Sequence, residues 1–119
     1  MQGTFITIKP GSGGLLATPI DGEPTLPAVK AAIGGGYIEE VKGFTTIEHG
    51  GKLHTCVVFC DEDGKRKQLP LNKLATTLWD QALRRIGQPT LARPDGSAID
   101  FLVGQVLVVI GDQEFLEAL

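Results

Sequence analysis

Hydrophobic and β-branched residues concentrate in four segments that have the composition of β-strands. These segments are Phe5–Ile8, Tyr37–Ile47, Leu53–Cys60 and Val106–Ile110, and Gly, Pro or Asp residues lie near their ends. β-Branched and aromatic residues between such turn formers are typical of strands. The Cys56–Cys60 half of the third segment is apolar on both faces. Apolar residues on both faces suggest a strand at the centre of a sheet.

The second and third segments are predicted to form a hairpin. His49-Gly50-Gly51-Lys52 separates them and has the residues that a tight turn requires. The Lys42-Gly43 pair interrupts the alternation within the second segment and predicts a β-bulge there.

Other turn formers define loops and one further strand. Asp63-Gly64 predicts a turn, after which Lys65–Leu69 is expected to run back as a short edge strand. The stretch from residue 11 to 23 contains Gly and Pro and is expected to be a loop, as is Gln88–Ser97.

Helical periodicity is clearest between Lys73 and Ile86. Asn72 is a good N-cap for this helix, and Gly87 is expected to end it. Apolar residues recur at helical spacing and predict one buried stripe, made of Leu74, Ala75, Leu78, Trp79, Ala82 and Ile86.

Two shorter helices are expected. Thr25 can cap the first, Pro27 is tolerated in its first turn, and Gly34 ends it. The second, Glu114–Leu119, is a short terminal helix or tail.

The order of these elements predicts an α+β fold in a single domain, residues 1–119. Strand, helix, strand, strand, helix and strand follow one another, which suits an antiparallel-rich sheet of four to five strands with two helices on one face. This arrangement is similar to a split βαβ unit. A chain of 119 residues is long enough for one core and too short for two.

Composition and charge narrow the classes of function. The formal net charge is −3 and the sequence pI is about 5.3, which makes nucleic-acid binding an unfavourable hypothesis. No signal peptide is visible, and Val106–Ile110 is far shorter than the roughly 20 apolar residues of a membrane span. We therefore expect a cytoplasmic protein that is not bound to a membrane, as a monomer or a homodimer.

The segment Asp61–Asn72 combines three acids with three bases. Its Asp-x-Asp start resembles a calcium loop, but Lys65, Arg66 and Asn72 stand where an oxygen ligand, a Gly and a Glu are required. In an extended chain Arg66 also faces away from Lys65 and Lys67, so the bases form no continuous stripe. We interpret the segment as a charged turn that leads into the long helix.

Cysteine and histidine residues offer little chemistry. Cys56 and Cys60 are about 13 Å apart along one strand, beyond the reach of a disulfide, and we expect structural cysteines in the core. Their spacing from His49 and His54 matches no known zinc pattern. Hydrolase chemistry around Glu39, His49 and His54 is one hypothesis, ranked below the two that follow. The pattern predicts no catalytic residues, no metal and no cofactor, hence no enzyme.

A glycine-rich loop suggests a different hypothesis, the binding of a small ligand or nucleotide. Gly11, Ser12 and Gly13 follow a predicted strand, as a phosphate-binding loop would, but the Gly-Lys-Ser/Thr ending is absent. Together with Lys65 and Arg66 they are the candidate anion contacts of a small-ligand or nucleotide-binding protein that sequesters its ligand.

The order of several short motifs resembles a known family. The motifs are Gly36-Tyr37-Ile38-Glu39, Asp61-Glu62-Asp63-Gly64-Lys65, Leu69-Pro70-Leu71-Asn72, Val103-Gly104-Gln105-Val106 and Gly111-Asp112. The chain is similar in this order to small proteins carried by phages, plasmids and other mobile elements of bacteria, known as a domain of unknown function. The resemblance implies no reaction. Our leading hypothesis is therefore a non-enzymatic interaction module, an accessory protein of a phage or other mobile element that binds a host protein.

Overall fold

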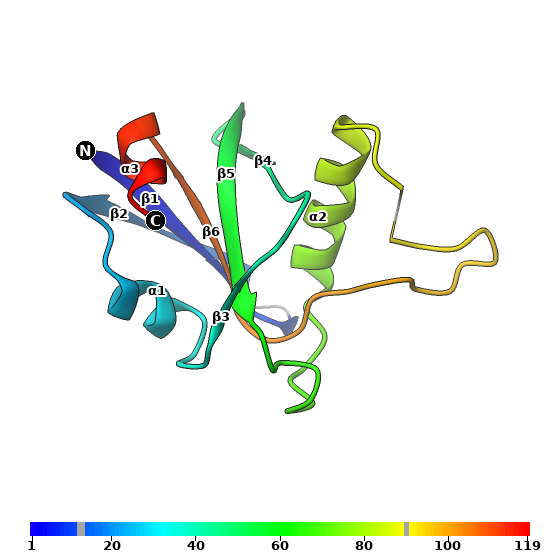
Figure 1. Ribbon diagram of the computed structural model, residues 1–119. Coiled ribbons are helices and arrows are strands. Elements are labelled where there is room, and N and C mark those ends of the chain that lie inside the picture. Colours follow the sequence, from blue (N-terminus) through cyan, green and yellow to red (C-terminus); the bar gives the residue numbers. More distant parts are fainter. Residues whose placement is uncertain (12–13, 90) are drawn as a thin grey trace.

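The computed structural model describes residues 1–11, 14–89 and 91–119, and a six-stranded sheet forms its centre (Figure 1). The strands are β1 Gln2–Ile8, β2 Leu15–Asp21, β3 Ile38–Glu40, β4 Thr46–His49, β5 Lys52–Asp61 and β6 Val106–Gly111. They follow the order β2-β1-β6-β5-β3, and β4 also pairs with β5. Every pairing between these strands is antiparallel, so the expected split βαβ arrangement, which needs a parallel pair, was wrong. The α+β class and the antiparallel sheet are confirmed, whereas the expected four to five strands were too few, since the described sheet has six.

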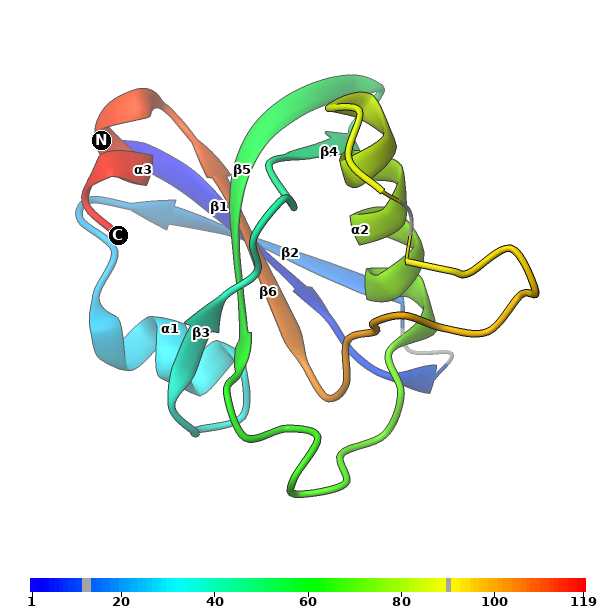
Figure 2. The same ribbon diagram turned by 45° about the vertical axis from the view of Figure 1, so that its right-hand side comes forward.

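Three helices in the described part of the chain cover the sheet: α1 Leu26–Ala32, α2 Lys73–Arg85 and α3 Gln113–Glu117. Figures 1 and 2 show α2 on one side of the sheet and α1 and α3 on the other. The two main predicted helices, α1 and α2, were expected on the same face, and this expectation was wrong because they lie on opposite faces. All five residues from Val106 to Ile110 are buried, and successive side chains of a strand point to opposite faces. Both faces of β6 consequently need a cover.

Two hydrophobic clusters lie on the two faces. One joins α2 to the sheet and includes Ile6, Ile8, Val58, Ala75, Trp79, Ala82, Val106 and Val108. The other joins α1 and α3 to the opposite face and includes Phe5, Val29, Ile33, Phe59, Leu107, Val109 and Phe115. Among the described residues, no helix is long and apolar enough to cross a membrane.

The buried side of α2 differs from the predicted stripe. Ala75, Trp79, Ala82 and Leu83 are buried, whereas Leu74 and Ile86 are exposed. The buried positions 75, 79, 82 and 83 are spaced by four, three and one residues, so the buried stripe is rotated toward Leu83. Both predicted helix ends are confirmed. The Asn72 side chain accepts from the backbone N–H of Ala75, and α2 ends at Arg85, just before Gly87.

The strand β2 falls within the stretch that was predicted to be a loop. Its side chains are mostly exposed, so the hydrophobic pattern carries no signal for it. β2 lies at the edge of the sheet and pairs with β1 through its backbone, with Pro19 opposite Thr4. Proline has no backbone N–H to donate, and it is tolerated in an edge strand because one side of such a strand has no neighbour that needs this donor.

The predicted edge strand Lys65–Leu69 is absent, and residues 62–68 form a series of turns instead. Backbone hydrogen bonds within this segment are local: Lys67 N–H donates to the Asp63 carbonyl and Leu69 N–H to the Gly64 carbonyl. Gln68 has a φ of 58°, which an extended strand cannot contain. The turn at Asp63-Gly64 is confirmed, and the bases that follow it extend the turn.

The hairpin of β4 and β5 is confirmed, with His49 opposite Lys52 and Gly50-Gly51 between them. Both glycines have positive φ, 60° and 78°, as a two-residue hairpin turn demands. The interruption predicted at Lys42-Gly43 separates β3 from β4.

Asn72, the last residue of the Leu-Pro-Leu-Asn segment, makes long-range hydrogen bonds in addition to capping α2. Its side-chain N–H₂ donates to the carbonyls of Ile8 (2.9 Å) and Gly104 (2.8 Å), and its backbone N–H donates to the Leu102 carbonyl (2.8 Å). Leu71 and Val103 form a β-bridge beside it. The buried amide therefore joins the end of β1, the start of α2 and the segment before β6.

Candidate binding surface

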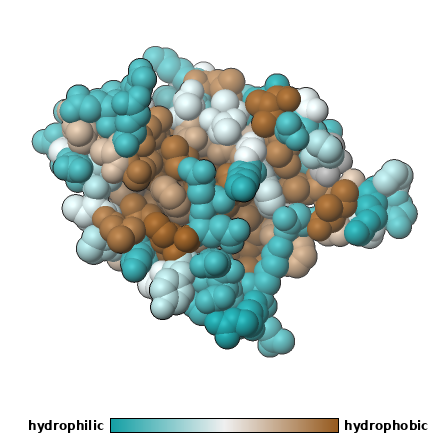
Figure 3. All heavy atoms as spheres, viewed as in Figure 1, coloured by the Kyte–Doolittle hydropathy of each residue, from teal (hydrophilic) through white to brown (hydrophobic). Residues whose placement is uncertain are grey.

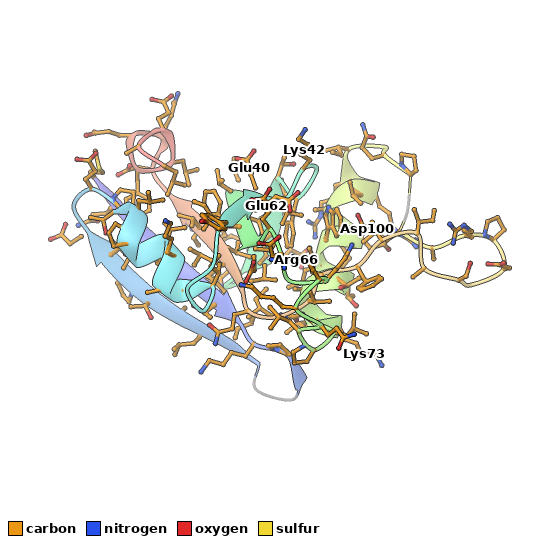
Figure 4. All side chains as sticks on the ribbon, turned by 60° about the horizontal axis from the view of Figure 1, so that its bottom comes forward. Glu40, Lys42, Glu62, Arg66, Lys73 and Asp100 are labelled. Atoms are coloured by element: carbon orange, nitrogen blue, oxygen red, sulfur yellow. The ribbon has the colours of Figure 1, made fainter. Side chains whose placement is uncertain are left out.

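A hollow of about 320 Å³ lies where the end of β5, the 62–68 turn and the segment before β6 come together. Val41, Cys60 and Trp79 contribute to its apolar wall. Its charged lining is mostly negative, with Glu39, Glu40, Asp61, Glu62 and Asp100 against Lys42 and Lys65. We call this region the acidic hollow. Figure 4 shows labelled side chains of Glu40, Glu62 and Asp100 that reach it from separate segments.

Lys65 crosses from the 62–68 turn to the segment before β6. Its ammonium group pairs with the Asp100 carboxylate and lies 4.6 Å from the centre of the Phe101 ring. Both charged side chains are about half exposed, so solvent screens the pair and its contribution to stability is small. The contact nevertheless shows that this position accommodates a cation, held by a carboxylate and an aromatic face.

Asp61 is the buried carboxylate of the acidic hollow. It accepts hydrogen bonds from Lys67 Nζ (2.7 Å) and from the backbone N–H of Asp63 (2.8 Å). Gly36 lies against it, and a Cβ at that glycine would be 2.5 Å from Asp61 Oδ2. Burial raises the pKa of Asp61, but the hydrogen bonds and the charge of Lys67 outweigh it, so the pKa lies below its ordinary value of 3.8.

This pKa predicts loss of stability in acid. A carboxyl whose folded-state pKa is depressed stabilises the fold above its unfolded-state pKa, and the contribution disappears as the pH falls through the folded value. Chemical unfolding of the wild type and of Asp61→Asn, measured from pH 6 to pH 2, tests this. We expect the stability advantage of the wild type to shrink below about pH 4. An advantage that stays constant over this range would contradict the role of the Asp61 charge.

The residues predicted to contact an anion are placed as follows. Lys65 lines the acidic hollow, whereas Arg66 is exposed and pairs with Asp63 at 3.2 Å. Gly11 follows β1, with a φ of 80°, and Ser12 and Gly13 lie outside the described residues. Both basic side chains thus already have carboxylate partners.

A second concave region, which we call the apolar groove, adjoins the acidic hollow. It has a volume of about 590 Å³ and lies between α2 and residues 91–101. Its lining includes Leu71, Thr76, Leu91, Ala98 and Phe101. Asp100 and Phe101 line both regions, so the hollow and the groove form one continuous surface. We refer to it as the Phe101 surface.

Residues 91–99 form an arm that projects from the rest of the chain, as Figures 1 and 2 show. Side chains of α2 hold the first residue of the arm, Leu91, and the segment that follows the arm, at Leu102. Asp80 Oδ1 accepts from the backbone N–H of Leu91 (3.0 Å), and Thr76 Oγ1 accepts from that of Leu102 (3.0 Å). Figure 3 shows hydrophobic residues at the base of the arm and hydrophilic ones over the 62–68 turn.

The sequence predicted this region only as a loop and a turn. Leu71, Ile99 and Phe101 are exposed, by 49%, 54% and 37%, yet none belongs to a periodic pattern that would mark a surface. The available signal was the presence of large apolar residues beside loop formers, which is weak because scattered apolar residues are common on protein surfaces.

The cysteines are free, and the structure agrees with their interpretation as core residues. Cys56 is buried and Cys60 is half-buried. Burial raises the pKa of Cys56 to about 12, with Arg85 opposing it. Burial, assisted by the charges of Glu39 and Asp61, raises the pKa of Cys60 to about 11.

These pKa values predict slow thiol chemistry. The thiolate is the reactive form, so at pH 8 the native Cys60 should react with a disulfide reagent about 100-fold more slowly than a free cysteine, and the native Cys56 about 1,000-fold more slowly. Unfolding in guanidinium should expose two fast-reacting thiols. A native thiol as fast as the unfolded one would contradict this result.

The histidines do not assemble with Glu39. His54 Nε2 lies 3.0 Å from the His49 carbonyl at the β4–β5 hairpin, while Glu39 pairs with Cys60 at the other end of β5. Six residues of strand separate these positions, about 20 Å. The structure therefore contradicts a catalytic group that combines Glu39 with His49 and His54. Over the described part of the chain, no three His, Cys, Asp or Glu side chains are grouped as metal ligands would be.

The fold and the surface together define a small α+β protein built on an antiparallel sheet with helices on both faces. The chain belongs to the family described as a domain of unknown function, DUF3846, whose model matches residues 1–117. This confirms the resemblance to a domain of unknown function, whereas an origin in phages or plasmids stays a prediction. Comparisons with curated proteins and with solved structures find no match.

Proposed function

We propose that the protein is a non-enzymatic binding module that recognises another protein through the Phe101 surface. The observation that carries this proposal is the continuity of the acidic hollow and the apolar groove at Asp100 and Phe101. Interfaces between proteins combine an aromatic or apolar centre with a charged rim, and a few anchors supply most of the binding energy. Phe101, exposed between a charged and an apolar region, has the position of such an anchor.

The proposed biological setting is that of an accessory protein. The order of motifs in the sequence resembles proteins of phages and other mobile elements, and small proteins of this kind often act by binding and blocking a host protein. We propose that the target is a host protein and that binding covers the base of the arm and the 62–68 turn.

Small-ligand or nucleotide binding is the alternative proposal. Lys65 and Arg66 would supply the anion contacts, but Asp100 and Asp63 already pair with them. An anion would also enter a hollow whose lining contains more carboxylates than ammonium groups. Repulsion between like charges makes this alternative weaker than protein binding.

A comparative pull-down from a bacterial host lysate tests protein binding. The baits are the wild type, Phe101→Lys and Leu53→Lys. Leu53 is a matched control because it is exposed (55%) and lies on β5, away from the Phe101 surface. We expect one or more proteins captured by the wild type and by Leu53→Lys and lost with Phe101→Lys. No capture, or equal capture by all three baits, would count against the proposal.

A thermal-shift screen against nucleotides and cyclic nucleotides tests the alternative. A ligand that binds only the folded state raises the melting temperature. The alternative predicts a rise that Lys65→Ala abolishes, whereas the protein-binding proposal predicts no rise with any of these compounds.

A further inference from the structure

We infer that the partner presents a basic side chain close to a large apolar one, and that these enter the acidic hollow and the apolar groove respectively. This inference rests on the proposed function and adds the chemistry of the partner. Its basis is the charge of the acidic hollow and the continuity of the hollow with the apolar groove.

The acidic hollow has carboxylates left over for a partner. Asp61 pairs with Lys67, and Asp100 pairs with Lys65. Glu39, Glu40 and Glu62 are exposed, and none of them has an ion pair with a described residue of the chain. Lys42 and Lys65 are the two basic residues of the described lining. Figure 4 shows that Glu40 and Glu62 lie near Lys42. A cation from outside would therefore find unpaired carboxylates.

Lys65 already makes the kind of contact that we expect from such a cation. Its ammonium group lies near the face of Phe101 and against the Asp100 carboxylate. Because Lys65 is about half exposed, a partner cation can share or displace this contact at low cost. Arginine suits the position best, since its planar guanidinium stacks on aromatic rings and binds carboxylates with two hydrogen bonds.

The apolar groove fixes the second feature of the partner. Leu71, Leu91 and Phe101 line it beside the aliphatic parts of Thr76 and Thr77. A large aliphatic or aromatic side chain in this groove would bury the exposed part of Phe101 and Leu71. Since the hollow and the groove share Phe101, the apolar and basic side chains must lie close together. This spacing is two positions in an extended segment and three or four in a helix.

The same charges exclude other occupants. A nucleic acid or an acidic peptide would place its negative groups beside Glu39, Glu40 and Glu62, and the chain carries a net charge of −3. Electrostatic complementarity favours a basic partner in both the rate and the selectivity of association.

Selection from a random peptide display library against the immobilised full chain tests the inference. Selected peptides are synthesised, and their affinity is measured by fluorescence anisotropy. We expect enriched peptides to contain Arg or Lys two to four positions from a large apolar residue. The charge-reversal variant Glu40→Lys/Glu62→Lys should lower their affinity about tenfold or more. Its matched control, Glu23→Lys/Glu114→Lys, has the same net charge but changes exposed residues outside the surface, and should lower affinity less than about twofold.

The outcomes separate the basic-partner inference from the proposed function. Peptides that lack a basic residue, or that respond equally to both double variants, would overturn the basic-partner inference. If Phe101→Lys still abolished the binding of such peptides, the proposed function would stand. Peptides that bind independently of Phe101, or no enrichment at all, would overturn the inference, and the pull-down would then decide the proposed function separately. Thermal unfolding of each variant shows that a lost affinity does not come from a lost fold.

Discussion

Asn72→Asp is expected to lower the free energy of unfolding by about 3 kcal/mol, because it removes two buried hydrogen bonds and adds a buried charge. The amide of Asn72 is 1% exposed and donates to the carbonyls of Ile8 and Gly104. An aspartate keeps an oxygen that can accept from the Ala75 N–H, but it places a carboxylate against both carbonyl oxygens. Urea unfolding followed by circular dichroism measures the change.

The exposed cap of α1 provides the control for Asn72. Thr25 caps that helix by accepting from the Ala28 N–H (3.3 Å) and makes no comparable long-range contact. Thr25→Ala should therefore cost only about 1 kcal/mol, the usual value for a lost cap. If Asn72→Asp cost no more than Thr25→Ala, the amide would be a helix cap only, and its proposed role in joining β1, α2 and the segment before β6 would be wrong.

Gly3→Ala is expected to have an effect of similar size, about 3 kcal/mol, through overpacking. A Cβ at Gly3 would overlap the ring of Phe115 and lie 2.7 Å from the carbonyl oxygen of Ile110. Neither neighbour can move easily, since the ring is fully buried and the carbonyl belongs to β6. We therefore expect β1 to separate locally from α3 and the melting temperature to fall.

A double-mutant cycle with Phe115→Ala identifies the cause of this loss. Phe115→Ala alone should cost 3–5 kcal/mol, roughly the usual range for a buried phenylalanine. Because the ring that Gly3→Ala meets is then absent, the double variant should be only slightly less stable than Phe115→Ala, the remainder reflecting the Ile110 carbonyl. Fully additive losses would contradict the contact between Gly3 and Phe115 as the source of the effect.

Much of the fold follows from the sequence because burial and local chemistry agree there. The apolar run of β6, the Gly50-Gly51 turn and the caps Thr25 and Asn72 each have a local cause, and all are confirmed. β2 lacked such a cause, since its side chains are exposed and only its backbone pairs with β1. The placement of helices on both faces is likewise a tertiary property. The fully apolar β6 requires this placement, because its side chains point to both faces.

The candidate site was harder to predict than the fold. Lys65 was expected to contact an anion from an edge strand, whereas it lies in a turn and pairs with Asp100, which is 35 residues away in the chain. Phe101 follows a predicted loop and had no partner in the sequence pattern. Such a surface depends on the packing of segments that are distant in sequence, and neither periodicity nor spacing encodes it.

The most direct test of the Phe101 surface is NMR mapping of the ¹⁵N-labelled protein with a partner identified by the pull-down. We predict that the largest chemical-shift changes occur in residues 39–42, 62–66 and 91–103, with smaller ones in the first half of α2. The strand β2, the helix α1 and the helix α3 should show little change. Shift changes confined to β2 or to the face covered by α1 and α3 would contradict the account, because the partner would then bind a different surface.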